Sequence, residues 1–191
     1  GVKAGSVYRI TEQGAVTQTG NSYDLAIEGR GFFQVLMPSG ENAYTRAGNL
    51  SLNADGQLVT EDGYTIQPAI NVPGDATAIS VSKTGQVQAI RAGQTEAEVV
   101  GQIELANFVN EAGLNAIGDN LLMETAASGP ANVGAPGAAG FGNLLQGYTE
   151  ASNVDAVTEI TALIVAQRAY EMNSKVISAA DEMLQAANSV K

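Results

Sequence analysis

Glycine and proline divide the chain into two unlike parts. Gly147 is the last of 22 glycines, and no proline follows Pro136. Both residue types interrupt regular helices, glycine through its backbone freedom and proline through its ring and missing N–H. The segment after Gly147 can therefore form one long uninterrupted helix, whereas the earlier part is broken into short elements.

The earlier part has the pattern of β-strands. Short apolar or alternating runs such as LSLN, QLVT, AISVS and QVQAI are separated by turn sequences, of which Ala54-Asp55-Gly56 and Lys83-Thr84-Gly85 are examples. No gap of helix length separates these runs, which predicts an antiparallel meander or barrel-like fold. The expected fold class is mainly β: an antiparallel β-rich domain followed by one long C-terminal α-helix.

These patterns predict four successive segments. Residues 1–21 are an extended segment leading into the β domain, and residues 22–124 form the β-rich domain. Residues 125–150 contain small, flexible, uncharged residues and are predicted to be a Gly/Ala-rich extended connection. Residues 151–191 are the C-terminal coiled-coil-like helix.

The predicted helix repeats its residues every seven positions. One set of positions spaced seven apart holds bulky apolar residues. A second set, three residues after each of these, is apolar except for one polar residue. These two columns form a seam of Leu163, Ala166, Tyr170, Asn173, Ile177, Ala180, Leu184 and Ala187. With the apolar columns beside it, this seam covers roughly 160° of the helix, which is wider than the ~100° stripe of an ordinary surface helix.

One partner helix cannot cover an apolar face of that width. The pattern therefore favours a helix that packs with several helices from outside this chain, and packing against its own β domain is the alternative. Ser152, with Asp155 three residues later, fits a capping box, so the helix is expected to start near Ser152.

Gly29-Arg30-Gly31 begins like a phosphate-binding loop, but its continuation indicates a turn. A dinucleotide loop requires a third glycine at position 34, where this chain has glutamine, and a helix after it. The residues that follow favour a strand. We therefore predict that Gly29 and Gly31 form a tight turn and that Phe32 and Phe33 anchor the core.

Composition excludes several kinds of chemistry. The chain has no cysteine and no histidine, which removes thiol catalysis, histidine acid–base chemistry and most transition-metal sites. Nine basic residues against 20 acidic ones argue against a nucleic-acid partner. The sequence contains no run of 18 apolar residues, so no membrane insertion is predicted. No catalytic, cofactor-binding or metal-binding residue is expected, so the chain is predicted not to be an enzyme and to need no cofactor.

Three motifs, DLAIEGRGFFQV, YTRAGNLSLNADGQLVTEDGY and QGYTEASNVDAVTEITALIVAQRAYEMNSKVI, closely resemble those of the bacterial flagellar rod and hook proteins. The resemblance covers nearly the whole chain, and the last motif is most similar to that of distal rod subunits. Because the family begins with a long N-terminal helix that pairs with the C-terminal one, the present chain is expected to lack that helix.

The resemblance implies a structural subunit of the flagellar basal-body distal rod. Such a subunit polymerises into a helical tube that surrounds the export channel and transmits torque from motor to hook. The implied partners are other rod subunits, the proximal rod and hook proteins, and the surrounding bushing rings. The implied location is the periplasm-spanning rod, reached by flagellar type III export without a cleaved signal peptide.

Two alternative functions follow from the sequence. The first is a flagellar hook or proximal rod subunit, against which the C-terminal motif argues. The second is a surface β module that binds carbohydrate or calcium, suggested by the oxygen-rich stretch SLNADGQLVTED. A calcium site would raise the thermal stability in the presence of calcium.

Overall fold

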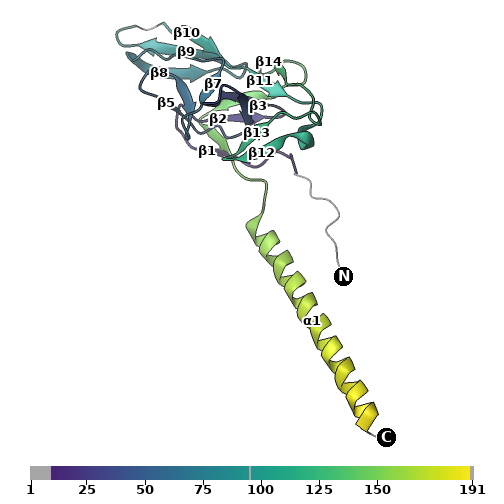
Figure 1. Cartoon of the computed structure of the whole chain (residues 1–191). Coiled ribbons are helices and arrows are strands. Elements are labelled where there is room, and N and C mark those ends of the chain that lie inside the picture. Colours follow the sequence, from purple (N-terminus) through teal and green to yellow (C-terminus); the bar gives the residue numbers. More distant parts are fainter. Residues whose placement is uncertain (1–9, 95, 190–191) are drawn as a thin grey trace. The chain divides into compact units, whose positions relative to one another are not determined.

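The chain consists of two units, which meet between Ala151 and Ser152. The computed structural model describes residues 10–94 and 96–189, with side chains described up to residue 185. The first unit, here the β unit, contains the strands, and the second contains a single continuous helix (Figure 1). The prediction of antiparallel β structure followed by one long C-terminal helix is thus confirmed.

The first half of the β unit contains strands β1 (Val16–Gln18), β2 (Leu25–Glu28), β3 (Phe32–Leu36), β4 (Asn42–Thr45), β5 (Leu50–Leu52), β6 (Leu58–Thr60), β7 (Thr65–Gln67) and β8 (Ala76–Val81). The second half contains β9 (Gln86–Arg91), β10 (Glu98–Gln102), β11 (Leu105–Asn107), the 3-10 turn η1 (Glu111–Gly113), β12 (Asn115–Gly118), β13 (Leu121–Met123), β14 (Asn132–Gly134), β15 (Asn143–Gln146) and β16 (Tyr148–Glu150). The second unit contains α1 (Ala156–Ser189).

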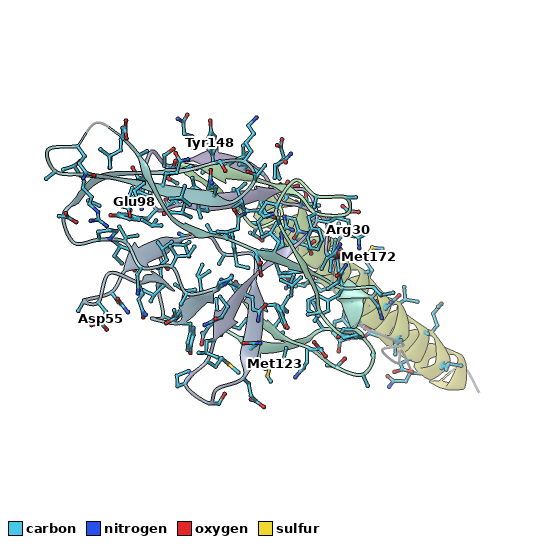
Figure 2. All side chains as sticks on the ribbon, turned by 90° about the horizontal axis from the view of Figure 1, so that it is seen from above. Arg30, Asp55, Glu98, Met123, Tyr148 and Met172 are labelled. Atoms are coloured by element: carbon cyan, nitrogen blue, oxygen red, sulfur yellow. The ribbon has the colours of Figure 1, made fainter. Side chains whose placement is uncertain are left out.

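The largest sheet has the strand order β12-β13-β4-β3-β7-β6-β5, and β11 joins it by pairing with both β3 and β14. Strands β8, β9 and β10 form a separate three-stranded sheet, and β2 pairs with β15. All strand pairs among the described residues are antiparallel. The β5–β6 and β8–β9 hairpins predicted from their turn sequences are confirmed, and Asp55 lies in the β5–β6 turn (Figure 2).

The core of the β unit is apolar and draws on strands from several sheets. Phe33, Ile27, Ile66 and Leu105 are among its fully buried side chains. Burying apolar surface of this kind contributes the main favourable term in folding. The fold therefore depends on contacts between segments that lie far apart in the sequence.

A second, smaller cluster of buried residues contains an aromatic group beside β3. The ring of Phe108 contacts those of Phe32 and Tyr44 edge to face, with centroid separations of 6.1 and 4.8 Å. Burial raises the pKa of the Tyr44 hydroxyl, and the nearby Glu124 carboxylate raises it further. This group fills the space between β3, β4 and the segment after β11.

Residues 125–150 differ from the extended connection expected there. They contain β14, β15 and β16, which pair with β11, β2 and β1 respectively. The small residues allow close packing: a Cβ on Gly142 would lie 2.5 Å from the carbonyl oxygen of Glu28. Glycine in this segment thus permits two backbones to approach each other closely. The high glycine and alanine content, which predicts a flexible connection, instead accompanies paired strands.

The segment before residue 22 also contains a strand. β1 pairs with β16, so the polypeptide enters and leaves the β unit on neighbouring strands. The register joins Val16 to Glu150 and Gln18 to Tyr148, the latter labelled in Figure 2. Within the expected extended segment, the described residues 10–21 thus contribute a strand to the sheet structure of the unit, and residues 1–9 lie outside the described residues.

Candidate functional site

The apolar side chains predicted to form the assembly face lie exposed on α1. Leu163, Tyr170, Ile177 and Leu184 keep 68, 76, 65 and 64% of their surface accessible. An α-helix places residues seven apart on nearly the same side, so these four residues form one stripe. Their accessible apolar surface is available for packing against other helices.

Neighbouring columns widen this stripe. Val176 and Met183 lie about 100° around the helix from it, and Val165 and Met172 lie further round in the same direction, each at least 62% exposed. Met172 is labelled on α1 in Figure 2. Ala166, Asn173 and Ala180 of the predicted seam are also exposed, whereas Ala187 falls outside the described side chains.

Asp155, and not Ser152, caps the start of α1. The Asp155 carboxylate accepts hydrogen bonds from the backbone N–H of Val157 at 2.9 Å and from the Thr158 hydroxyl at 3.0 Å. Ser152 instead accepts a hydrogen bond from the N–H of Val154, before the helix begins. The predicted capping box is therefore wrong, because the helix starts at Ala156, four residues after Ser152.

The start of α1 is expected to depend on pH. The hydrogen bond from the N–H of Val157, followed by that from Thr158, holds the pKa of Asp155 below its ordinary value. Capping by the carboxylate is therefore complete above the ordinary aspartate pKa and is lost as pH falls through the lowered one. NMR shifts of residues 156–160 should report loss of the first helical turn in acid.

Two substitutions at Asp155 separate capping from charge. Asp155→Asn keeps a good N-cap without a titrating group, so the helix start should remain and its pH dependence should vanish. Asp155→Ala should shorten the helix at every pH. A pH dependence that persists in Asp155→Asn would assign the effect to another group.

Gly29 and Gly31 connect β2 to β3 in left-handed backbone conformations. Their φ angles are 111° and 132°, a region that favours glycine. A Cβ on Gly29 would approach the Cα of Gly142 to 3.1 Å. Phe32 and Phe33 follow directly and are 3 and 0% exposed.

Arg30, between the two glycines, has a carboxylate partner. Its Nη2 lies 2.9 Å from Oε1 of Glu111, the first residue of the 3-10 turn η1. Because β3 follows the turn directly, no helix N-terminus is present there to bind a phosphate.

Arg46 organises the opposite side of this turn, a role that the sequence interpretation missed. Its Nη1 donates to the carbonyl oxygens of Gly29 and Gly31 at 3.0 and 2.9 Å, and its Nη2 donates to that of Ile27 at 3.3 Å. The guanidinium also lies 5.9 Å from the centre of the Phe32 ring. The planar, multi-donor guanidinium suits several acceptors at once.

Glu150 is the anionic partner of Arg46. Its Oε2 accepts from Nε at 2.9 Å and lies 2.7 Å from Nη2, and the two side chains are only 10 and 22% exposed. The other carboxylate oxygen, Oε1, accepts the backbone N–H of Gly14 at 2.9 Å. The carboxylate of Glu150, at the end of β16, thus binds both the segment before β1 and the Arg46 guanidinium, which in turn binds the β2–β3 turn.

Gln13 provides a second connection to the turn. Its amide donates to the carbonyl of Ile27 at 2.9 Å and accepts the N–H of Gly29 at 3.0 Å. The segment before β1 and the end of β16 are therefore both attached to the β2–β3 turn. The lone arginine in YTRAGN was the available sequence signal, although its partner is 104 positions away.

Among the described residues, no helix has the length and apolar character needed to cross a membrane. The same residues contain no group of three or more acidic side chains placed to hold a metal ion. The geometry supplies a long apolar helix face and an interlocked β unit, both suited to assembly.

Two family descriptions match the chain. Residues 26–89 match the flagellar hook protein FlgE/F/G D1 domain, and residues 145–190 match the C-terminal part of the flagellar basal-body rod FlgEFG proteins. The first match includes the Gly29–Gly31 turn and Arg46, and the second includes Glu150 and the apolar face of α1. The chain is also 66% identical to the flagellar basal-body rod protein FlgG of Caulobacter vibrioides. The matched region covers the whole of this chain and 73% of that relative.

The chain belongs to the flagellar hook and basal-body rod protein family. The FlgG protein of Bacillus subtilis is 41% identical over 97% of this chain and 71% of that relative. The hook protein FlgE of Salmonella typhimurium is 43% identical over 59% of this chain, which is 28% of that relative. The similarity to the rod proteins thus extends over more of the chain than the similarity to this hook protein.

This agreement confirms two predictions from the sequence: membership of the flagellar rod and hook family, and a structural subunit of the distal rod. The FlgG relatives are basal-body rod proteins, which supports the flagellar basal body as the location of this family member. Membership of a rod and hook family further supports self-association and assembly with rod and hook proteins.

Proposed function

We propose that α1 is the element through which subunits of this protein assemble into a helical tube. The observation that carries the proposal is the apolar face of α1, along which Leu163, Tyr170, Ile177 and Leu184 are each more than 60% exposed. An isolated helix is marginally stable in water and gains most of its stability from packing an apolar face. The face therefore favours a helix that is covered by other helices.

Packing of this face contributes favourable energy to assembly. Eight large side chains lie on the face: Leu163, Val165, Tyr170, Met172, Val176, Ile177, Met183 and Leu184. Full burial of such a side chain contributes about 1.5–3 kcal/mol, so the group supplies on the order of 10 kcal/mol before the entropic cost of association. The width of the face distributes this energy over several neighbouring helices.

In the proposed rod, the helices form the inner layer around the export channel and the tube transmits torque from motor to hook. The β unit, which contains the β-rich domain predicted at residues 22–124 together with β1 and β14 to β16, lies outside that layer. Neighbouring proximal rod and hook proteins and the bushing rings are the proposed partners. The subunit reaches the periplasm-spanning rod by export without a cleaved signal peptide, and its role is mechanical, without catalysis.

The proposal is tested by imaging the polymer formed by the rod protein that carries this chain. A density map of the rod should place residues 156–185 in the innermost layer, with the stripe from Leu163 to Leu184 against helices of neighbouring subunits. The β unit should lie at larger radius. An inner layer that lacks these residues would contradict the proposal.

A further inference from the structure

The two ends of the β unit meet in a geometry that is weak under tension. β1 and β16 are antiparallel, and their register pairs Val16 with Glu150 at the end nearest the outgoing segments. A force that separates those segments acts first on this pair, then on Thr17 and Thr149, and then on Gln18 and Tyr148. Hydrogen bonds broken one after another in this way resist force less than bonds that must break together.

The pair that would open first is also the one with the most side-chain connections. The N–H of Ala151 donates to the carbonyl of Ala15 at 2.8 Å, next to the pair. The Glu150 carboxylate adds its bonds from Gly14 and Arg46. Arg46 in turn donates to three carbonyl oxygens around the β2–β3 turn, which leads into the core through Phe32 and Phe33.

We propose that Arg46 and Glu150 form a mechanical lock, which holds the two outgoing segments together and fastens them to the core of the β unit. To pull β16 away from both β1 and the core, the Glu150 carboxylate must leave the N–H of Gly14 and the guanidinium of Arg46. Hydrogen bonds to charged groups are stronger than neutral ones, and both side chains are largely buried, so water replaces these bonds poorly. The lock converts a sequential opening into one in which several bonds must break together.

The role of the lock in the cell rests on the proposed function, because a torque-transmitting subunit passes force between its helix and its β unit through residue 151. The lock itself is a property of the isolated chain. Its failure and the failure of the proposed function can therefore be distinguished.

The experiment pulls single molecules of the 191-residue chain across β1 and β16. The chain has no cysteine, so cysteines introduced at the exposed positions Thr11 and Ser152 give two unique attachment points. The measured quantity is the rate at which the β1–β16 pair opens at constant force, before the rest of the unit unfolds. Glu150→Gln should open at least about tenfold faster, because a carboxylate bound to a guanidinium is replaced by a neutral amide.

Two further variants define the result. Glu111→Gln is the matched control, because it removes the carboxylate of the Arg30–Glu111 pair, which does not involve β1 or β16. It should leave the opening rate within about twofold of the parent, as expected for a pair with an exposed arginine. Arg46→Lys keeps the charge but loses the fork of donors, and it should open faster than the parent.

An opening rate in Glu150→Gln equal to that in Glu111→Gln would overturn the lock. So would a variant in which the whole β unit unfolds in the first event, since Arg46 and Glu150 would then support the core and not the outgoing segments. The lock requires a faster first event followed by an unchanged second one.

Discussion

Replacing Ile177 with aspartate is expected to abolish rod assembly while leaving the β unit folded. Ile177 is 65% exposed on α1 and lies at the middle of the stripe that packs against other helices in the proposed rod. In the assembled tube the new carboxylate would be buried without a partner. An uncompensated buried charge costs several kcal/mol, and each subunit in the tube would bear that cost. The β unit should fold because residue 177 belongs to neither of its core clusters.

Ser178→Asp is the matched control for this substitution. It adds the same charge one residue later, about 100° around the helix from the apolar stripe, where Ser178 is exposed. Swimming and the number of rods per cell should remain normal in Ser178→Asp and fall to zero in Ile177→Asp. Cells that swim normally with Ile177→Asp would show that α1 does not drive assembly.

Replacing Gly48 with alanine is expected to prevent stable folding of the β unit. A Cβ at this position would lie 1.6 Å from the carbonyl oxygen of Leu25 and 3.3 Å from the ring of Phe33. The carbonyl of Gly48 also accepts the N–H of Leu25 at 2.9 Å, so the two backbones cannot separate without losing this bond. We expect a loss of at least about 3 kcal/mol, at the upper end of the usual cost of overpacking.

Gly40→Ala provides the comparison, because Gly40 has a φ of 86° and no atom within 4 Å of its Cβ position. Its cost should be limited to backbone strain of about 1–2 kcal/mol. Denaturant unfolding of the two variants measures the difference directly. If Gly40→Ala were the more damaging change, the close approach at Gly48 would not determine stability.

Local patterns in the sequence predicted the elements that depend on local chemistry. The β5–β6 turn is an example: the Asn53 side chain accepts the N–H groups of Asp55 and Gln57, both at 2.9 Å, so five consecutive residues suffice to form it. The seven-residue repeat likewise predicted the long helix, because the spacing of apolar residues along one helix is visible in the local sequence. The start of α1 was misplaced because Ser152 and Asp155 are both good caps, and the backbone at Ala156 decides between them.

Elements that depend on distant partners could not be predicted in this way. β15 pairs with β2 across more than a hundred residues, and its small neighbours were interpreted as a flexible connection. The Arg46–Glu150 pair is equally distant, and neither residue has an unusual sequence context. An arginine in a strand-rich segment is ordinarily a solvated surface residue, so only the three-dimensional arrangement reveals its contacts with four acceptor oxygens.

The pairing of β1 with β16 brings the two ends of the β unit side by side. The segment from Val16 to Glu150 therefore begins and ends on two paired strands. The segment between β1 and β16 can therefore be lengthened, shortened or replaced by another domain whose termini lie side by side. The segments outside the two strands keep their spacing. A fluorescent or affinity domain grafted between these two strands would mark each subunit without altering the chain path of the assembling helix.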